Sequence, residues 1–227
     1  MMQKKKLRGY VASLFKNIRS FIFVVFDFLF PQTDLERIAS AMTVADIQKY
    51  VSVHTEENGS TTLFTYRTAL MRNMIWLLKY RGHKGVATTF GIVVSEYLME
   101  TLADATLFEN AMKPLLVPMP RSELRMKESG FNQTALVAQV IAEHCGNLIL
   151  AENALKKTRE TKPQTTLSKK ERLVNLKGSF EADPRVVKGR TIILFDDVIT
   201  TGSTMREAQS ALKRAGARHV MCIAIAR

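Results

Sequence analysis

The sequence predicts an α/β fold with a mainly parallel β-sheet flanked by helices and preceded by a basic helical arm. Two apolar runs rich in β-branched residues, Thr191–Phe195 and His219–Ala226, are typical of buried strands. The segment Thr204–Ala215 between them has the pattern of a helix and is closed by Gly216. Strand, helix and strand joined by short connections indicate a right-handed βαβ unit in a parallel sheet. The length of 227 residues suits one domain with a small appendage.

The predicted arm is basic first and apolar afterwards. Residues 1–20 hold six basic side chains and no acidic one, and the apolar run 21–30 follows, interrupted by Asp27 and ended by Pro31. The run is too short for a standard transmembrane helix and lacks the small-residue cleavage site of a signal peptide. We therefore expect a cytoplasmic protein whose arm is an amphipathic helix, either buried or in peripheral contact with the inner membrane surface.

Residues 31–62 are polar and mixed, and they end in the turn-like Glu57-Asn58-Gly59-Ser60. We place the domain boundary there, with the arm and polar segment at 1–62 and the α/β domain at 63–227. Within that domain the patterns predict the following elements in order: a helix over Thr68–Leu78 closed by Gly82, a helix over Val86–Leu102, a strand over Leu115–Val117, a helix over Asn132–His144, and a short strand over Leu148–Leu150. The longest polar stretch, residues 156–178, follows them, and a long loop inside a compact domain is often functional.

The candidate site begins where the strand at 191–195 meets the acids Asp196 and Asp197. Ligands bind at the carboxyl ends of strands in open α/β sheets, and backbone N–H groups at the following helix start attract a phosphate. Gly202 allows a close approach of the chain, and the hydroxyls of Thr200, Thr201, Ser203 and Thr204 add donors. Adjacent carboxylates beside a phosphate need a diol or Mg²⁺ to satisfy them, so the pattern predicts a ribose 5-phosphate site. The plainer alternative is a solvated acid pair before an ordinary helix start.

A basic stretch supplies a second group of candidates. The net charge is +12, and residues 121–190 hold 14 basic and 8 acidic side chains. Arg121, Arg125 and Lys127 follow a strand end bounded by prolines, where they would suit a pyrophosphate. Lys79 and Arg81 are interpreted first as helix-end charges that complement the helix dipole.

The segment Ile192–Thr204 (IILFDDVITTGST) resembles the fingerprint of the type I phosphoribosyltransferases. The resemblance implies that Asp196 and Asp197 face the ribose hydroxyls of phosphoribosyl pyrophosphate (PRPP), with Mg²⁺ bound directly or through ribose or water. It implies that Thr200, Thr201, Gly202, Ser203 and Thr204 hold the 5-phosphate.

Further blocks are similar to the ComF family, phosphoribosyltransferase-like proteins linked to natural competence. They are VPMPRSELRMKESGFNQ (117–133), IWLLKYRGHK (75–84) and the spaced residues Arg159, Thr161, Gln164, Leu167, Arg172, Asn175 and Phe180. The similarity runs from about residue 64 to residue 227 and implies that residues 156–178 form a mobile loop that closes over PRPP. Arg121, Arg125, Arg159 and Lys162 are then the candidates for pyrophosphate binding, with solvated loop charges as the alternative for the last two.

The sequence departs from these relatives at two points. ComF relatives often carry a four-cysteine zinc module after a Leu-Phe-Pro segment; here Leu29-Phe30-Pro31 is present without those cysteines, so we expect no zinc. Members that act on 6-oxopurines place an aspartate at the position of Thr200, and a threonine hydroxyl is a poor base near pH 7. That residue therefore disfavours hypoxanthine–guanine salvage.

Two functions follow as hypotheses. The first is a ComF-type phosphoribosyltransferase, a glycosyltransferase of nucleotide metabolism that binds PRPP with Mg²⁺ and releases pyrophosphate. The second is a non-catalytic protein that senses PRPP or assists DNA uptake, with its basic surface contacting single-stranded DNA or the uptake machinery. A homodimer is one option for the oligomeric state, which the sequence leaves open.

Overall fold

The structure is a computed structural model that describes residues 33–56, 59–104, 113–159 and 178–227. The basic arm at 1–30 lies outside these residues, as does most of the 156–178 stretch. None of the helices in the described ranges combines the length and the apolar character that crossing a membrane requires.

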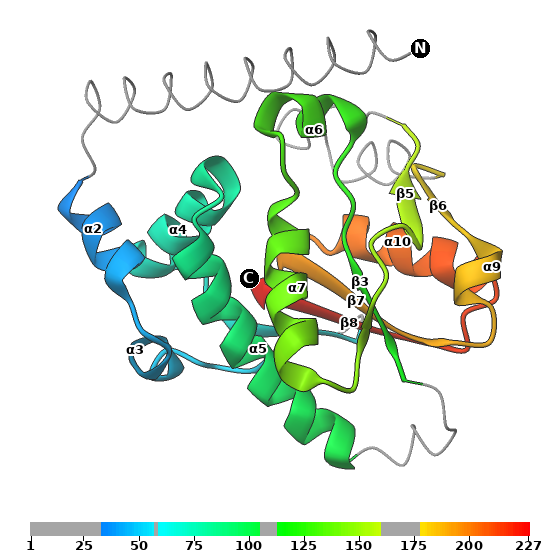
Figure 1. Cartoon of the computed structure of the whole chain (residues 1–227), viewed down its shortest axis with the longest axis horizontal. Helices are drawn as coiled ribbons and strands as arrows, with labels where there is room; N and C mark the ends of the chain where they lie inside the picture. Colours follow the sequence, from blue (N-terminus) through cyan, green and yellow to red (C-terminus); the bar gives the residue numbers. More distant parts are fainter. Residues whose placement is uncertain (1–32, 57–58, 105–112, 160–177) are drawn as a thin grey trace, which may run out of the picture.

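A six-stranded sheet forms the centre of the molecule, in the order β1-β2-β8-β7-β3-β4 (Figure 1). The strands are β1 (His54–Thr55), β2 (Ser60–Phe64), β3 (Leu115–Pro118), β4 (Ile149–Leu150), β7 (Thr191–Val198) and β8 (His219–Ala226). Every neighbouring pair is parallel except β1 and β2, which are antiparallel. The mainly parallel α/β fold that the sequence predicts is therefore confirmed.

Alternating side chains of the parallel strands pack into two hydrophobic cores, one on each face of the sheet. Ile193 and Phe195 of β7 pack against helices α4 (Ala69–Trp76), α5 (Lys84–Asp104) and α7 (Gln133–Cys145). Ile192 and Leu194 pack against α10 (Ser203–Arg214) and α9 (Pro184–Val187) on the opposite face. Because successive side chains of a strand point to opposite faces, burial on both sides explains why this strand is a continuous apolar run.

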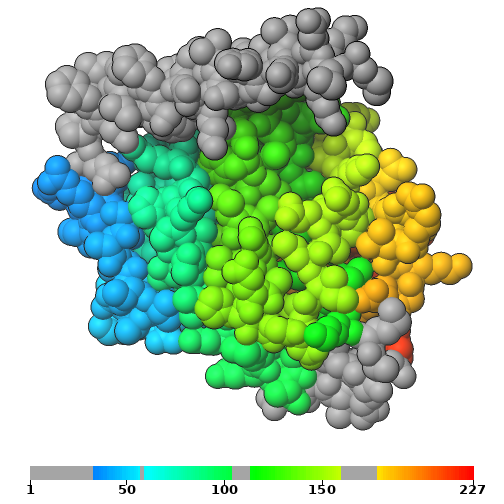
Figure 2. Space-filling model, in the orientation of Figure 1, coloured from blue at the N-terminus to red at the C-terminus, as the bar shows by residue number. Residues whose placement is uncertain are grey.

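Two short helices, α2 (Asp34–Ala41) and α3 (Val44–Gln48), precede the sheet. Each begins at a threonine, Thr33 or Thr43, that forms a capping box with an acidic residue three positions later. Figure 2 shows this segment on one flank of the molecule, beside α4. The strand β2 spans residue 62, so the sheet takes residues from both sides of the boundary that we placed there.

The predicted helices and strands are present, with ends shifted by a few residues. The helix predicted at 68–78 starts after its cap Thr68, continues as a π-helical turn, η1 (Leu77–Arg81), and ends at Gly82 in the left-handed region. The sequence analysis did not identify α2, α3, β1, β2, α9, the short helix α6 (Glu123–Ser129), or the antiparallel pair β5 (Leu155–Lys157) and β6 (Phe180–Ala182).

Candidate functional site

The two acids lie near the end of β7, which extends to Val198 rather than ending at Phe195. Strand alternation places the side chain of Asp197 on the face of α7 and that of Asp196 on the face of α10. The Asp197 N–H donates to Asp196 Oδ1 at 2.8 Å. A ligand above the strand end can therefore meet one carboxylate from each face.

Asp197 is buried and held from two other elements. Lys79 Nζ of η1 lies 3.4 Å from Asp197 Oδ1, and Gln133 Nε2 at the start of α7 donates to Asp197 Oδ2 at 2.7 Å. A buried carboxylate stays ionised only with such compensation. Lys79, which the sequence analysis interpreted as a helix-end charge, thus reaches the acid pair, so that interpretation missed its contact.

Asp196 has the opposite surroundings. Burial, followed by the charge of Asp197, raises the pKa of the Asp196 carboxyl well above its ordinary range. The hydrogen bond from the Asp197 N–H, and then the positive charges of Lys79 and Lys157, oppose this rise without cancelling it. The acid pair therefore holds one compensated carboxylate and one that lacks an equal counter-charge, and the second gains most from a ligand that donates hydrogen bonds.

The loop after β7 turns at Gly202, whose φ of 68° lies in the left-handed region, and enters α10 at Ser203. Thr200 and Thr201 are exposed, Gly202 and Ser203 are buried, and Thr204 is half-buried. Thr201 Oγ1 and Ser203 Oγ are 2.8 Å apart, and the N-cap residue of α10 is Gly202, which has no side chain to cap the helix. The first turn of a helix attracts an anion such as a phosphate through its N–H groups and its dipole.

The basic side of the site begins one strand away. Pro118 at the end of β3 is in register with Phe195 of β7, and this pairing brings the segment that follows Pro118 next to the acids. The half-buried Arg121 donates from Nη1 to Ser129 Oγ at 3.1 Å. Burial and then the charge of Arg125 lower the pKa of Arg121, while Asp197 acts in the opposite direction. Arg121 is therefore electrostatically linked both to the acid pair and to exposed Arg125 on α6.

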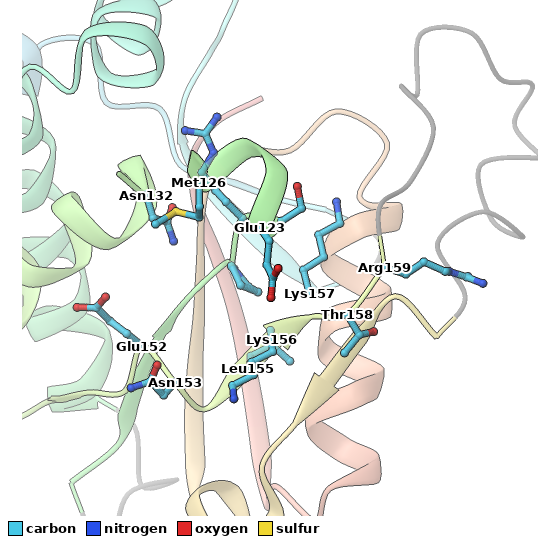
Figure 3. A pocket seen from close by; sticks show the side chains of 13 residues that line it. Glu123, Met126, Asn132, Glu152, Asn153, Leu155, Lys156, Lys157, Thr158 and Arg159 are labelled. Carbon is cyan, nitrogen blue, oxygen red and sulfur yellow. The ribbon is translucent and has the colours of Figure 1, made fainter. Parts of the chain in front are cut away.

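An open pocket of about 630 Å³ lies between α6 and β5 (Figure 3). Arg121, Lys157 and Arg159 all line it, and Figure 3 shows Arg159 extending outward from the end of β5. The ladder of β5 and β6 pairs Lys157 with Phe180, so it fixes both ends of the predicted mobile loop. Lys162 lies within that loop, outside the described residues.

Two buried polar atoms near the pocket and the acids have no hydrogen-bond partner among the described residues: Ser122 Oγ and Gln133 Oε1. Unpaired buried polar atoms are costly unless a ligand or water completes them. In the described ranges, no three His, Cys, Asp or Glu side chains gather to hold a metal ion. The acid pair offers two carboxylates, so Mg²⁺ fits here only when a bound ligand supplies most of its oxygens.

Sequence analysis did not find Lys79 and Gln133 as members of the site. Both lie within motifs that it quoted, IWLLKYRGHK and VPMPRSELRMKESGFNQ, but neither residue type carries chemistry by itself. Their contact with Asp197 depends on how η1 and α7 pack against the sheet, which local patterns do not reveal.

Comparisons with known proteins find similar sequences for part of this chain. The family described as "Phosphoribosyl transferase domain" matches residues 136–227. "Competence protein F" of Haemophilus influenzae is 32% identical over 114 residues, which cover 49% of each chain. "DNA utilization protein YhgH" of Escherichia coli K12 is 36% identical over 149 residues, covering 65% of this chain and 63% of that protein. "Competence protein ComFC" of Bacillus subtilis is 26% identical over 155 residues, covering 68% and 58%.

Over about two thirds of its length the chain is similar to the ComF proteins. The predicted resemblance to that family, within the phosphoribosyltransferase superfamily, is thereby confirmed. The matched segments span between about half and just under two thirds of the length of these relatives. The segment that matches the phosphoribosyl transferase domain contains the acid pair and the Thr200–Thr204 loop, whereas Lys79, Arg121 and Gln133 lie before it.

Proposed function

We propose that this ComF relative binds PRPP and transfers its phosphoribosyl group to a nitrogen of a base or amine, with release of pyrophosphate. The observation that carries the proposal is the arrangement at one edge of the sheet. The ends of β7 and β3 bring together an acid pair, a helix start whose N-cap is Gly202, and a pocket lined by Arg121, Lys157 and Arg159. These three features match the ribose diol, the 5-phosphate and the pyrophosphate of PRPP.

Each group has a role in the proposed reaction. The carboxylates of Asp196 and Asp197 accept hydrogen bonds from the ribose hydroxyls and orient the ring. The segment 200–204 anchors the 5-phosphate through its N–H groups and hydroxyls. The bond between C1 and the pyrophosphate oxygen breaks, the electron pair leaves with pyrophosphate, and the acceptor nitrogen bonds to C1 and then loses its proton. Arg121, Arg125, Arg159 and Lys162 stabilise the charge that develops on the leaving group.

Magnesium is proposed to arrive with PRPP. Mg²⁺ is usually held by one or two carboxylates together with substrate phosphates, and the acid pair offers two carboxylates of this kind. The ion would neutralise charge on the pyrophosphate, while the residues of the chain hold the ribose and the 5-phosphate.

Calorimetric titration with PRPP and Mg²⁺ tests the proposal. We expect saturable binding by the wild type and a loss of at least about tenfold in affinity for Asp196→Asn/Asp197→Asn, because two hydrogen-bond acceptors for the diol are weakened. The control is Asp183→Asn, which removes a half-buried carboxylate that pairs with Arg185 at the start of α9, a helix that supplies none of the proposed site residues. Absence of PRPP binding by folded wild-type protein would refute the proposal.

The second candidate is a non-catalytic role in DNA uptake, with PRPP bound as a signal. Two observations favour it: the names of the relatives, which refer to competence and DNA utilization, and the net charge of +12. Binding of single-stranded DNA that weakens steeply with salt, without pyrophosphate release in the presence of any base, would support this candidate over the first.

A further inference from the structure

The ion pair of Lys79 with Asp197 joins two parts of the chain that are far apart in sequence. Lys79 comes from the π-helical turn η1, and Asp197 comes from β7 in the middle of the sheet. The Asp197 side chain is 6% exposed and that of Lys79 is 31% exposed, so this contact is not an ordinary surface pair. Single π-helical turns occur frequently at functional sites.

Both carboxylate oxygens of Asp197 are already engaged. Lys79 Nζ lies 3.4 Å from Oδ1, and Gln133 Nε2 donates to Oδ2 at 2.7 Å. A divalent cation that approached Asp197 would compete with these partners for the carboxylate oxygens. It would also meet the positive charge of the ammonium at short range, where repulsion is strong in a partly buried site.

Only one of the two polar atoms of the Gln133 side chain forms a hydrogen bond within the described part of the chain. Its Nε2 donates to Asp197, whereas its buried Oε1 has no partner within the part of the chain that the structure describes, and the residue as a whole is 8% exposed. The Gln133 Oε1 atom can accept a hydrogen bond from a ligand hydroxyl. It can also accept one from the Lys79 ammonium if that group leaves Asp197. In the structure both oxygens of Asp197 therefore have a partner, whereas the neighbouring Gln133 keeps one acceptor that a ligand can use.

We propose that Lys79 is a positioning residue whose ammonium group pairs with Asp197 in the absence of ligand. This pairing prevents a free divalent cation from binding to the acid pair. A divalent cation binds there only when a phosphorylated ligand brings it. When that ligand binds, the ammonium leaves Asp197 and pairs with an anionic oxygen of the ligand. The inference deepens the proposed function and rests on it for the identity of the ligand. The exclusion of free cations is a property of the chain alone and can be measured without PRPP.

Binding of Mn²⁺ alone, followed by electron paramagnetic resonance, is the test. We expect wild-type protein to bind Mn²⁺ weakly and Lys79→Met to bind it roughly ten- to a thousandfold more tightly, the range by which one adjacent charge alters the ionisation of a carboxylate. Lys79→Arg should behave as the wild type, and Lys79→Met/Asp197→Asn should lose the gain. Lys84→Met makes the same charge change at an exposed position of the next helix and should leave Mn²⁺ affinity unchanged.

A folded Lys79→Met protein that binds Mn²⁺ no better than the wild type would overturn the inference. Should Lys79→Met fail to fold, chemical labelling of the wild-type lysines gives a second readout. Lys79 should be modified more slowly than Lys84 in the wild type and should lose that protection in Asp197→Asn; equal rates in both proteins would overturn the inference. If the wild-type protein fails to bind PRPP, the proposed enzymatic function is refuted. The Mn²⁺ measurement tests the role of Lys79 independently of that result.

Discussion

Asp196 and Asp197 are adjacent in sequence and identical in chemistry, yet the fold gives them opposite conditions. Asp197 has a lysine and an amide donor within hydrogen-bonding or ion-pairing distance, whereas the pKa of Asp196 is raised by burial and by the charge of Asp197 itself. The sequence indicated that the pair needs a partner, because like charges repel. Which of the two acids the chain itself neutralises could not be predicted, since Lys79 and Gln133 come from distant segments.

This difference predicts opposite effects of two isosteric substitutions. Asp196→Asn should raise the melting temperature, because it removes a carboxylate whose ionisation is unfavourable in the folded state. A raised pKa means that the stability contributed by Asp196 is present at low pH and is lost as the pH rises through the folded-state pKa. The gain from Asp196→Asn should therefore be larger at pH 8.5 than at pH 5 in thermal melts.

Asp197→Asn should instead destabilise the protein by roughly 1–3 kcal/mol, because a charge-assisted hydrogen bond and the partner of Lys79 are lost. Chemical denaturation at pH 7.5 measures the effect. A destabilising Asp196→Asn, or a neutral Asp197→Asn, would contradict the assignment of the compensated acid.

At the scale of elements, α5 and α7 approach each other closely on one face of the sheet (Figure 1). A Cβ atom added at Gly91 of α5 would lie 2.5 Å from Val140 Cβ of α7, closer than two carbon atoms can pack. Gly91 therefore sets the spacing of the two helices. Because α7 starts at Gln133, the same contact supports one partner of Asp197.

Gly91→Ala should destabilise the protein by about 1–3 kcal/mol, as overpacking in a filled core does. Gly85→Ala, in the first turn of the same helix, is the matched control: its added Cβ would meet only the His83 ring, and it should be neutral or slightly stabilising. Denaturant unfolding measures both. Gly91→Ala/Val140→Ala should recover part of the loss, and a Gly91→Ala protein as stable as the wild type would disprove the close contact.

The elements show where sequence patterns are sufficient. Helices α4, α5, α7 and α10 and strands β7 and β8 were predicted because each buries a long apolar face. The strand β2 was missed because Ser60, Thr61 and Thr62 make half of it polar, although Ser60 and Thr62 are buried. The pair β5 and β6 was missed because Lys156 and Lys157 read as part of a polar loop, while Leu155 and Phe180 hold the pair in the core.

For the whole molecule, the sequence predicted the fold class and the edge of the sheet that carries the site, because a βαβ unit with acids at a strand end defines both. It did not predict the position of β3 beside β7, which brings Arg121 to the acids. Strand order depends on long-range pairing, and local patterns carry no information on it. The resemblance to ComF proteins supplied the basic residues that pattern analysis alone left open.

The net charge of the whole chain predicts how the basic arm contributes to binding of polyanions. Residues 1–30 hold six basic side chains and one acidic side chain out of the total that gives +12. Deleting residues 1–30 should lower the salt concentration at which the protein leaves a heparin column, because fewer counterions are released on binding. PRPP titration should be unchanged, and a truncated protein with lost PRPP binding would show that the arm belongs to the site.

The sheet order also has a consequence for synthesis on the ribosome. Strand β8 is made after all the other strands, yet it lies between β2 and β7 near the centre of the sheet. While the chain emerges, β2 and β7 therefore have no shared neighbour, and their edges stay open to incorrect pairing. Folding of this kind waits for contacts between the two halves of the chain, which makes it slow and favours protection of the nascent protein by chaperones.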